Sequence, residues 1–505
     1  MLRKRTGVST RFVLLVGLSS LACSGEQVLG DYPPCTCDLA EPPSQLSDTP
    51  LSIATFWAAD PHERDAFQTL VERVDQQRYF VSTQQMSTRV AVQRHISDAF
   101  ESQQLPDVFQ VNAGSDVLRW VQDQPRDASD VCSLDRLRER YHYERGYFAA
   151  ALAPLSCHGS LYGLPVGIHH LNVLFYNTQR WQELSARAAA SGAALPAPDS
   201  LQSAGQLVAL LGRIAELGIT TAEGAPLVPL AMGTESGWPL TILAFEDVLL
   251  GLERSAYETL WMGGLAGAAG TEEVELRRRL SDVLSLLRQL RGFSNAAARS
   301  SWQAALRQVG TGEALMTAMG DWGWAQLSDE AKANVAMVTF PGTAGTFVYT
   351  PDSFAVPREL GKNGFPARSF LHDVVEDKDA LIEFSNAKHS IPPRRDLSEA
   401  DIARLSRESL RATYRDFTRC QAGEGDCRLL LAVSGLAPPP GTDACFDEMD
   451  ALLAIAVDDS AVALDAPEEP RACAEPFPKT SQEAEQRLLD LLIGVARRRF
   501  AAACR

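Results

Sequence analysis

The hydrophobic and polar positions in the first part of the chain alternate between two periods. The segment "LSIATFW" (51–57) has the alternation that is typical of a strand. "ERDAFQTLVERVDQQ" (63–77) places apolar residues at helical spacing. "TRVAVQRHISDAFESQQ" (88–104) predicts another helix, alone or after a short strand, and "LPDVFQVNAG" (105–114) predicts a strand that ends in a polar turn. Strands that alternate with helices indicate an α/β sheet.

The segment "LYGLPVGIHHLNVLFYN" (161–177) predicts two short apolar strands around a turn at Gly167, Ile168, His169 and His170. A simple hairpin would favour Asn-Gly or Asp-Gly at this place, and neither pair is present. We therefore interpret the segment as a passage from one lobe of the protein to another.

Beyond residue 177 the pattern becomes mostly helical. The clearest amphipathic helix is "TEEVELRRRLSDVLSLLRQLRGF" (271–293), and short strands are expected at "ALMTAMG", "VAMVTFPG" and "DSFAVP". A last helix begins near Thr480, which forms a capping box with Glu483. The Cys-, Pro- and acid-containing stretch near 420–475 is expected to be a loop-rich appendage.

The length and charge of the chain narrow the class of protein. With 505 residues, two or three domains are expected. The formal net charge of −17 argues against a nucleic-acid partner, since phosphate binding needs clustered Lys and Arg.

The N-terminus has the layout of a secretory signal peptide. A basic start that includes Arg3, Lys4 and Arg5 precedes the short apolar run "FVLLVGLSSLA", and Cys23 follows. The run is shorter than the roughly 20 residues that span a bilayer. It resembles a lipoprotein signal, so residues 1–22 are expected to be removed and Cys23 to carry a lipid. Residues 23–50 contain many prolines and predict a tether.

Ten cysteines in an exported chain suggest disulfides. If Cys23 is acylated, nine remain, so at least one is unpaired or pairs outside the chain. The sequence leaves the connectivity open, with Cys420–Cys427 favoured and Cys132–Cys157 next. The other cysteines are Cys35, Cys37, Cys445, Cys473 and Cys504. Because no Cys-x-x-Cys pair occurs, no metal site is expected.

The sequence lacks the usual catalytic signatures for phosphate binding, dinucleotide binding, metalloproteolysis and serine hydrolysis. A carboxylate pair of the glycosidase type stays open as an alternative. Tryptophans at strand ends and turns, at Trp57, Trp238 and Trp322, could close over a core. They could also pack on a sugar ring while Asp321 binds its hydroxyls.

Seven segments in chain order resemble the extracellular solute-binding proteins of sugar ABC transporters, of the type II periplasmic-binding-protein class. The resemblance is strongest to the glucose and gluco-oligosaccharide branch. The segments are "ATFW", "LPDVFQVNAG", "GSLYGLPVGIHHLNVLFYN", "PLAMGTESGWPLTILAFEDVLL", "TGEALMTAMGDWGWAQL", "FPGTAGTFVYTPDSFAVP" and "HSIPPRRDLS".

The resemblance implies two α/β lobes, three crossing segments and a ligand cleft between the lobes. The first lobe would hold residues 51–166 and 352–388. The second, helix-rich lobe would hold 167–351 and 389–505. Matching positions imply ligand-binding roles for Trp57, Glu63, Gln110, Asn112, His169, Trp238, Asp321, Trp322 and His389.

The function that the resemblance implies is capture of a sugar and its delivery to ABC transporter permease subunits. The protein would act as a monomer in the periplasm or at the cell surface, held to a membrane through Cys23, without a cofactor and without enzymatic activity. A carbohydrate-active surface enzyme and a sugar sensor without a transporter are the alternatives.

Overall fold

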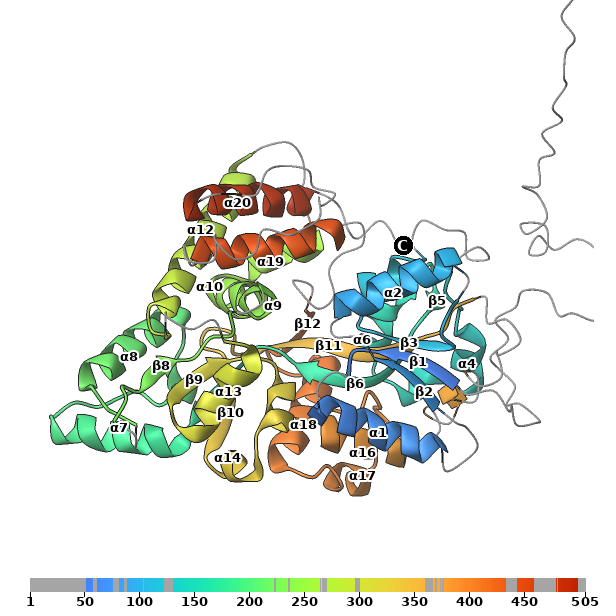
Figure 1. Cartoon of the computed structure of the whole chain (residues 1–505), viewed down its shortest axis with the longest axis horizontal. Helices are drawn as coiled ribbons and strands as arrows, with labels where there is room; N and C mark the ends of the chain where they lie inside the picture. Colours follow the sequence, from blue (N-terminus) through green and yellow to red (C-terminus); the bar gives the residue numbers. More distant parts are fainter. Residues whose placement is uncertain are drawn as a thin grey trace, which may run out of the picture.

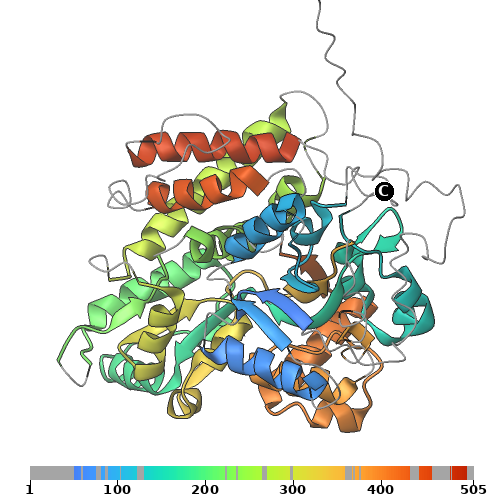
Figure 2. The same ribbon diagram turned by 45° about the vertical axis from the view of Figure 1, so that its right-hand side comes forward.

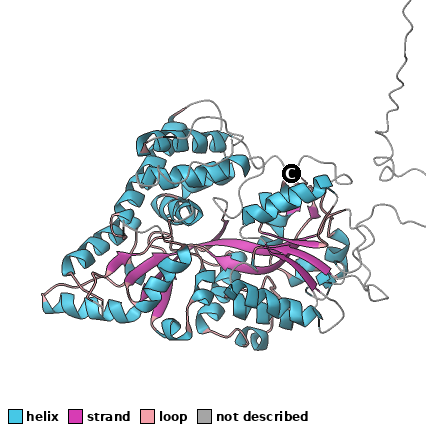
Figure 3. Ribbon diagram, in the orientation of Figure 1, coloured by secondary structure: helices cyan, strands magenta, loops and turns pink. Residues whose placement is uncertain are grey.

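The structure is a computed structural model. It describes residues 51–57, 61–75, 81–85, 89–102, 104–121, 130–221, 224–234, 237–263, 265, 270–295, 300–358, 367, 370–372, 374, 377–432, 443–457, 478 and 480–497. Two lobes, each built on its own sheet, lie side by side along the long axis of the molecule (Figure 1, Figure 3). The predicted α/β architecture is confirmed.

The first lobe is organised around a six-stranded mixed sheet in the order β12-β11-β3-β1-β2, with β6 also paired to β11. β1 pairs in parallel with β2 and β3, whereas β11 runs antiparallel to β3 and β6. The alternating apolar residues of β1, Leu51 and Ile53, are fully buried, as the sequence pattern predicts. The strands are β1 (Leu51–Thr55), β2 (Val81–Gln85), β3 (Val108–Val111), β6 (Leu164–His170), β11 (Thr346–Ala355) and β12 (Arg428–Leu431).

Helices cover both faces of the first-lobe sheet, with α2 on one side and α1, α16, α17 and α18 on the other (Figure 1). These helices are α1 (Pro61–Asp75), α2 (Arg89–Ser102), α16 (Lys378–Lys388), α17 (Glu399–Ala403) and α18 (Glu408–Ala422). Short elements fill the stretch between β3 and β6: α3 (Ser115–Leu118), α4 (Asp135–Arg140), α5 (Tyr143–Gly146), α6 (Ala149–Leu152), η2 (Ala153–Leu155) and the hairpin of β4 (Ser156–Cys157) and β5 (Ser160–Leu161).

The second lobe has a four-stranded sheet in the order β10-β7-β9-β8. Its strands are β7 (Val173–Asn177), β8 (Val228–Leu230), β9 (Ala314–Ala318) and β10 (Val335–Thr339). Its helical elements are α7 (Thr178–Ala190), η3 (Pro198–Ser200), α8 (Ala204–Leu217), α9 (Gly237–Thr241), the π-helical η4 (Ile242–Leu249), α10 (Leu250–Leu252), α11 (Arg254–Glu258), the π-helical η5 (Thr259–Gly263), α12 (Thr271–Arg291), α13 (Trp302–Thr311), η6 (Asp321–Gln326), α14 (Asp329–Ala333), α19 (Asp443–Val457) and α20 (Ser481–Arg497).

The passage between the lobes differs from the predicted turn at Gly167–His170. β6 runs from Leu164 to His170, and its backbone pairs with β11 across one register shift between Asp352 and Ser353. The chain leaves the first-lobe sheet at Leu171 and Asn172 instead and enters β7 of the second-lobe sheet. The Asn172 side chain donates to Thr343 Oγ1 (2.8 Å) and to the Thr346 carbonyl (3.0 Å), which ties this passage to the start of β11.

The predicted division of the chain is wrong for residues 389–432. The buried face of α18, including Tyr414 and Phe417, packs on Phe347 and Tyr349 of β11, and β12 extends the first-lobe sheet. A helical pattern shows which face is apolar but not which lobe will cover it. The boundaries at 166/167 and 351/352 likewise fall inside β6 and β11.

The C-terminal part is more helical than predicted. α19 and α20 pack on each other and against α12, forming a helical layer on the second lobe (Figure 1, Figure 2). α19 lies within the stretch expected to be a loop-rich appendage. At the start of α20 the Thr480 hydroxyl accepts the Glu483 N–H at 3.1 Å, which is one half of the predicted capping box.

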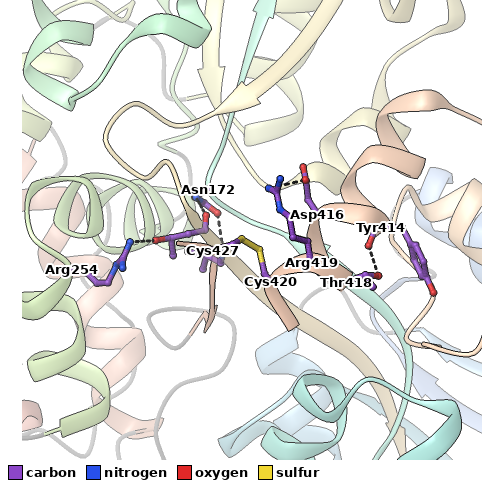
Figure 4. Close-up of a disulfide and its surroundings, with 10 residues drawn as sticks. Asn172, Arg254, Tyr414, Asp416, Thr418, Arg419, Cys420 and Cys427 are labelled. Atoms are coloured by element: carbon purple, nitrogen blue, oxygen red, sulfur yellow. Dashed lines mark hydrogen bonds and ion pairs between the residues drawn. A yellow bond between two sulfur atoms is a disulfide. The ribbon is translucent and has the colours of Figure 1, made fainter. Parts of the chain in front are cut away.

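The predicted disulfide Cys420–Cys427 is present and joins the end of α18 to the residue before β12 (Figure 4). Its Cα atoms are 4.8 Å apart. Cys132 and Cys157 are each disulfide-bonded as well. The predicted Cys132–Cys157 pairing stays a prediction. Cys132 lies beside the end of β11, where its N–H donates to Val356, while Cys157 lies in the β4–β5 hairpin.

The N-terminal predictions lie outside the described residues, which begin at Leu51. This applies to the signal peptide, to Cys23 and to the tether, as well as to Cys35, Cys37, Cys473 and Cys504. Within the part of the chain that the structure describes, no helix combines the length and apolar character needed to cross a membrane.

Candidate ligand site between the lobes

The junction of the lobes brings together side chains from the first-lobe sheet and from η6 of the second lobe. η6 follows β9 and contacts β6, α1 and α16. Its first residues, Asp321 and Trp322, therefore meet His169 of β6. Three of the nine predicted site residues are thus in one cluster.

His169 is the centre of this cluster. Its Nδ1 lies 2.7 Å from Asp321 Oδ1, and its Nε2 lies 3.1 Å from Asp352 Oδ2. All three side chains are buried. Burial alone would lower the pKa of His169, but the two carboxylates raise it to about 9. The sequence analysis did not predict Asp352 as a site residue. Its place next to His169 results from the pairing of β11 with β6.

The two carboxylates differ in their surroundings. Burial raises the pKa of Asp321, and the charge of His169 only partly offsets this. For Asp352, burial is outweighed by His169 and by the charge of Lys388, which together lower its pKa. One oxygen of Asp321 is bound by His169. The other, Oδ2, is buried and has no hydrogen-bond partner among the described residues.

Three tryptophans group beside this cluster on the second lobe. Trp238 in α9 lies 6.1 Å from the Trp302 ring and 6.3 Å from the Trp322 ring. Trp322 and Trp302 belong to η6 and α13, and the Trp322 edge also meets His169 at 5.4 Å. Gly320 is required here, because a Cβ atom would lie 1.9 Å from the Trp322 ring. Trp238 is partly exposed, so its ring can contact a ligand.

On the first lobe, Trp57 is fully buried at the end of β1. Its ring is surrounded by phenylalanines, including Phe354 at 5.6 Å and Phe384 at 5.4 Å. Lys388 Nζ lies 5.4 Å from the ring centre and forms an ion pair with Glu63. Trp57 Nε1 is buried and lacks a hydrogen-bond partner in the described part of the chain.

Gln110 and Asn112 lie at the carboxyl end of β3, and both are buried. Gln110 Oε1 accepts from the Thr55 hydroxyl and the Phe56 N–H, which fixes the end of β1. Its Nε2 has no partner among the described residues. The Asn112 N–H donates to Asp116 Oδ2 at 3.2 Å. The strand pattern predicted the position of both residues.

A profile of the family described as "Bacterial extracellular solute-binding protein" matches residues 75–406. The match covers most of the chain. The chain belongs to this family.

Curated relatives of this solute-binding protein are distant. An uncharacterised ABC transporter extracellular-binding protein of Pyrococcus horikoshii is 26% identical over 294 residues, 58% of this chain and 59% of the relative. The xylose/arabinose-binding protein XacG of Haloferax volcanii is 25% identical, over 51% of this chain and 50% of the relative. The chain thus spans between half and two thirds of the curated relatives that it matches.

Solved structures show that the fold is shared more widely. The bacterial solute receptor AcbH, described as preferring β-D-galactopyranose, superposes with a TM-score of 0.62 at 15% identity. The superposition covers 89% of this chain and 99% of AcbH. The predicted two-lobed binding-protein fold is confirmed.

Two further residues of the solute-binding protein complete the junction. His389, at the end of α16, adopts a left-handed conformation (φ 57°) and stacks on Trp324 of η6 at 5.6 Å. Burial, together with the charge of His169, lowers the pKa of His389 to about 3, so its ring is neutral. Trp324 lies in the segment "TGEALMTAMGDWGWAQL" but was not predicted to be a site residue. Its place beside His389 depends on a contact far apart in sequence.

The chemistry available at the junction is hydrogen bonding and aromatic packing. Both ring nitrogens of His169 already face carboxylates, and no group of His, Cys, Asp and Glu side chains in the described ranges is arranged to hold a metal ion. A small pocket opens beside α9, between η4 and the ends of β8 and β9. It is lined by Leu230, Ala231, Met232, Gly233, Pro239, Leu240, Leu243 and Ala318.

Proposed function

We propose that the protein is a sugar receptor that captures its ligand between the two lobes and delivers it to the permease of an ABC transporter. The observation that carries the proposal is the buried Asp321 Oδ2, which lacks a hydrogen-bond partner among the described residues and lies beside the Trp238–Trp302–Trp322 group. A carboxylate oxygen accepts from sugar hydroxyls, and an indole packs on the C–H face of a pyranose.

The relatives support the same class of ligand. One is described as binding xylose and arabinose, and one structural neighbour as preferring galactose. The sequence resemblance favours glucose or a gluco-oligosaccharide. We therefore propose a neutral mono- or oligosaccharide of the glucose type as the ligand.

The test is calorimetric titration of the protein with glucose, gluco-oligosaccharides, galactose, xylose and arabinose. Asp321→Asn should weaken binding of the best sugar by about 30- to 150-fold, equivalent to about 2–3 kcal/mol. Asp329→Asn is the matched control, because the Asp329 side chain is 96% exposed on α14. If no sugar binds, or if Asp321→Asn binds as tightly as the control, the proposal is wrong.

Analysis of the sugar in the same titrated samples distinguishes a receptor from a carbohydrate-active enzyme. A receptor returns the sugar chemically unchanged, whereas an enzyme consumes it over hours. Chromatography of the sugar after overnight incubation distinguishes the two outcomes.

We also propose that the receptor is held to a membrane through a lipid on Cys23. The basic start, the short apolar run and the cysteine after Ala22 support this proposal. Cys23→Ser should move the protein from the membrane fraction to the soluble fraction. Retention of the variant in the membrane fraction after a high-salt wash would contradict it.

A further inference from the structure

His169 was expected to bind the ligand, but its surroundings point to a different role. Both of its ring nitrogens face carboxylate oxygens, Asp321 Oδ1 at 2.7 Å and Asp352 Oδ2 at 3.1 Å. The Trp322 ring lies 5.4 Å from the His169 ring, nearly perpendicular to it. No ring nitrogen is left for a sugar hydroxyl, so His169 can act on a ligand only through its partners.

The two carboxylates come from different parts of the fold. Asp352 lies on β11, one of the crossing strands of the first-lobe sheet, and His169 lies on the neighbouring strand β6. Asp321 begins η6 of the second lobe. The contact between His169 and Asp321 therefore joins the lobes.

Two carboxyl groups that face both ring nitrogens favour a charged ring. A neutral imidazole has one N–H donor, whereas an imidazolium has two and can donate to both carboxylates. Lys388 of α16 also acts on Asp352 by its charge, and it forms its own ion pair with Glu63 of α1. Arg407 and Lys332 act by their charges on His389. His389, after α16, is neutral.

We infer that His169 is a positioning residue: a doubly donating imidazolium that clasps Asp321 of the second lobe to Asp352 of the crossing strand and leaves Asp321 Oδ2 for the sugar. The inference rests on the proposed function, since the sugar is the ligand that Asp321 would bind. In this arrangement the Asp321 carboxylate of the second lobe is held in place, and His169 itself does not contact the ligand.

The pKa of His169 sets the pH range of the effect. It is raised to about 9 in the folded protein from an ordinary value of 6.5. A raised pKa means that the charged clasp is fully formed below pH 6.5 and is lost as the pH rises through 9. Sugar affinity should thus be level from about pH 6 to 8 and fall above about pH 9.

The first experiment measures sugar affinity by calorimetry between pH 6 and 10 for the wild type, His169→Gln and His170→Gln. A glutamine amide cannot donate to two carboxylates in these positions, so His169→Gln should bind about 10- to 100-fold more weakly at pH 7. Its affinity should not show the fall near pH 9. His170→Gln is the matched control. His170 stacks on Phe347 at 3.9 Å, and burial lowers its pKa to about 4, so it is neutral.

The second experiment needs no sugar and no stable variant. The ¹⁵N chemical shifts of the His169 ring in the wild-type protein should report two protonated nitrogens at pH 7.5. A neutral imidazole at pH 7.5, or a sugar affinity that is level to pH 10 in the wild type, would overturn the inference. If the wild type binds no sugar, the proposed function fails, while the ring titration still tests the clasp.

Discussion

The surroundings of Trp57 and of Trp238 show how the same side chain at the edge of a lobe can serve different purposes. Trp57 is fully buried among phenylalanines of the first lobe, under the Lys388 ammonium. Trp238 is partly exposed and packs against the second-lobe core beside Trp302 and Trp322. The first arrangement stabilises a lobe, whereas the second leaves part of the ring exposed for the proposed ligand. A tryptophan at a strand end is therefore not in itself a sign of a sugar site.

The largest effect is expected from Trp57→Ala. Removing a fully buried aromatic ring leaves a cavity that the surrounding phenylalanines cannot fill, which should cost about 3–5 kcal/mol of the free energy of unfolding. Urea denaturation of the wild type and the variant measures the loss. A loss below about 1 kcal/mol would mean that Trp57 is not a core residue, and the comparison with Trp238 would fail.

Trp238→Ala should have the opposite profile. We expect a fall in sugar affinity of about 30- to 150-fold, or about 2–3 kcal/mol, because the sugar loses an indole face. The melting temperature without sugar should change little. Trp181→Ala is the control, since Trp181 is a partly buried tryptophan on α7 that packs on Tyr176. Equal sugar affinity of the two variants would remove Trp238 from the site.

Much of this comparison lies beyond what the sequence can predict. The local patterns predicted β1, α1, β3, α12 and the Cys420–Cys427 bond, since each depends on neighbouring residues. They could not predict that Trp57 would be enclosed, because Phe354 and Phe384 lie about three hundred positions further along the chain.

The centre of the candidate site is similarly non-local. Asp352 meets His169 because β11 pairs with β6 in a register that sets Thr350 opposite His169, with Asp352 two residues along the strand. The motif around Asp321 indicated a polar turn, but the sequence could not show that His169 would bind it. Motifs identified the elements that meet at the junction, and strand register determines which side chains face one another.

The disulfide Cys420–Cys427 offers a second test of whether a change in stability can be separated from a change in sugar affinity. The double variant Cys420→Ser/Cys427→Ser should lose about 2 kcal/mol of the free energy of unfolding, as expected for a short loop. Sugar affinity should stay unchanged, because the bond joins α18 to the residue before β12 (Figure 4), and β12 pairs with residues 346–349 of β11, before Asp352. Serine substitution is preferred to reduction, since Cys132 and Cys157 are also disulfide-bonded. A loss of affinity equal to that of Trp238→Ala would show that stability and binding are not separable here.

The smallest effect concerns Asp247, a fully buried residue of η4 in the second lobe. Neither of its carboxylate oxygens has a hydrogen-bond partner among the described residues, and burial, aided by the charge of Glu246, raises its pKa well above the usual value. The folded state then binds a proton that the unfolded state releases above about pH 4, so Asp247 lowers stability as the pH rises past that point. Asp247→Asn should be more stable than the wild type by about 1 kcal/mol at pH 7, and this advantage should vanish below pH 4. Thermal unfolding at both pH values checks the sign, and an advantage that persists at low pH would contradict it.

The Asn172 side chain has a mechanical consequence. Its amide donates to Thr343, in the loop before β11, and to Thr346, the first residue of β11. Its Oδ1 accepts the Val348 N–H at 2.9 Å. These hydrogen bonds join the end of β6 to the start of β11 at the point where both crossing strands leave the second lobe. Sliding of one crossing strand along the other would therefore have to break these three hydrogen bonds.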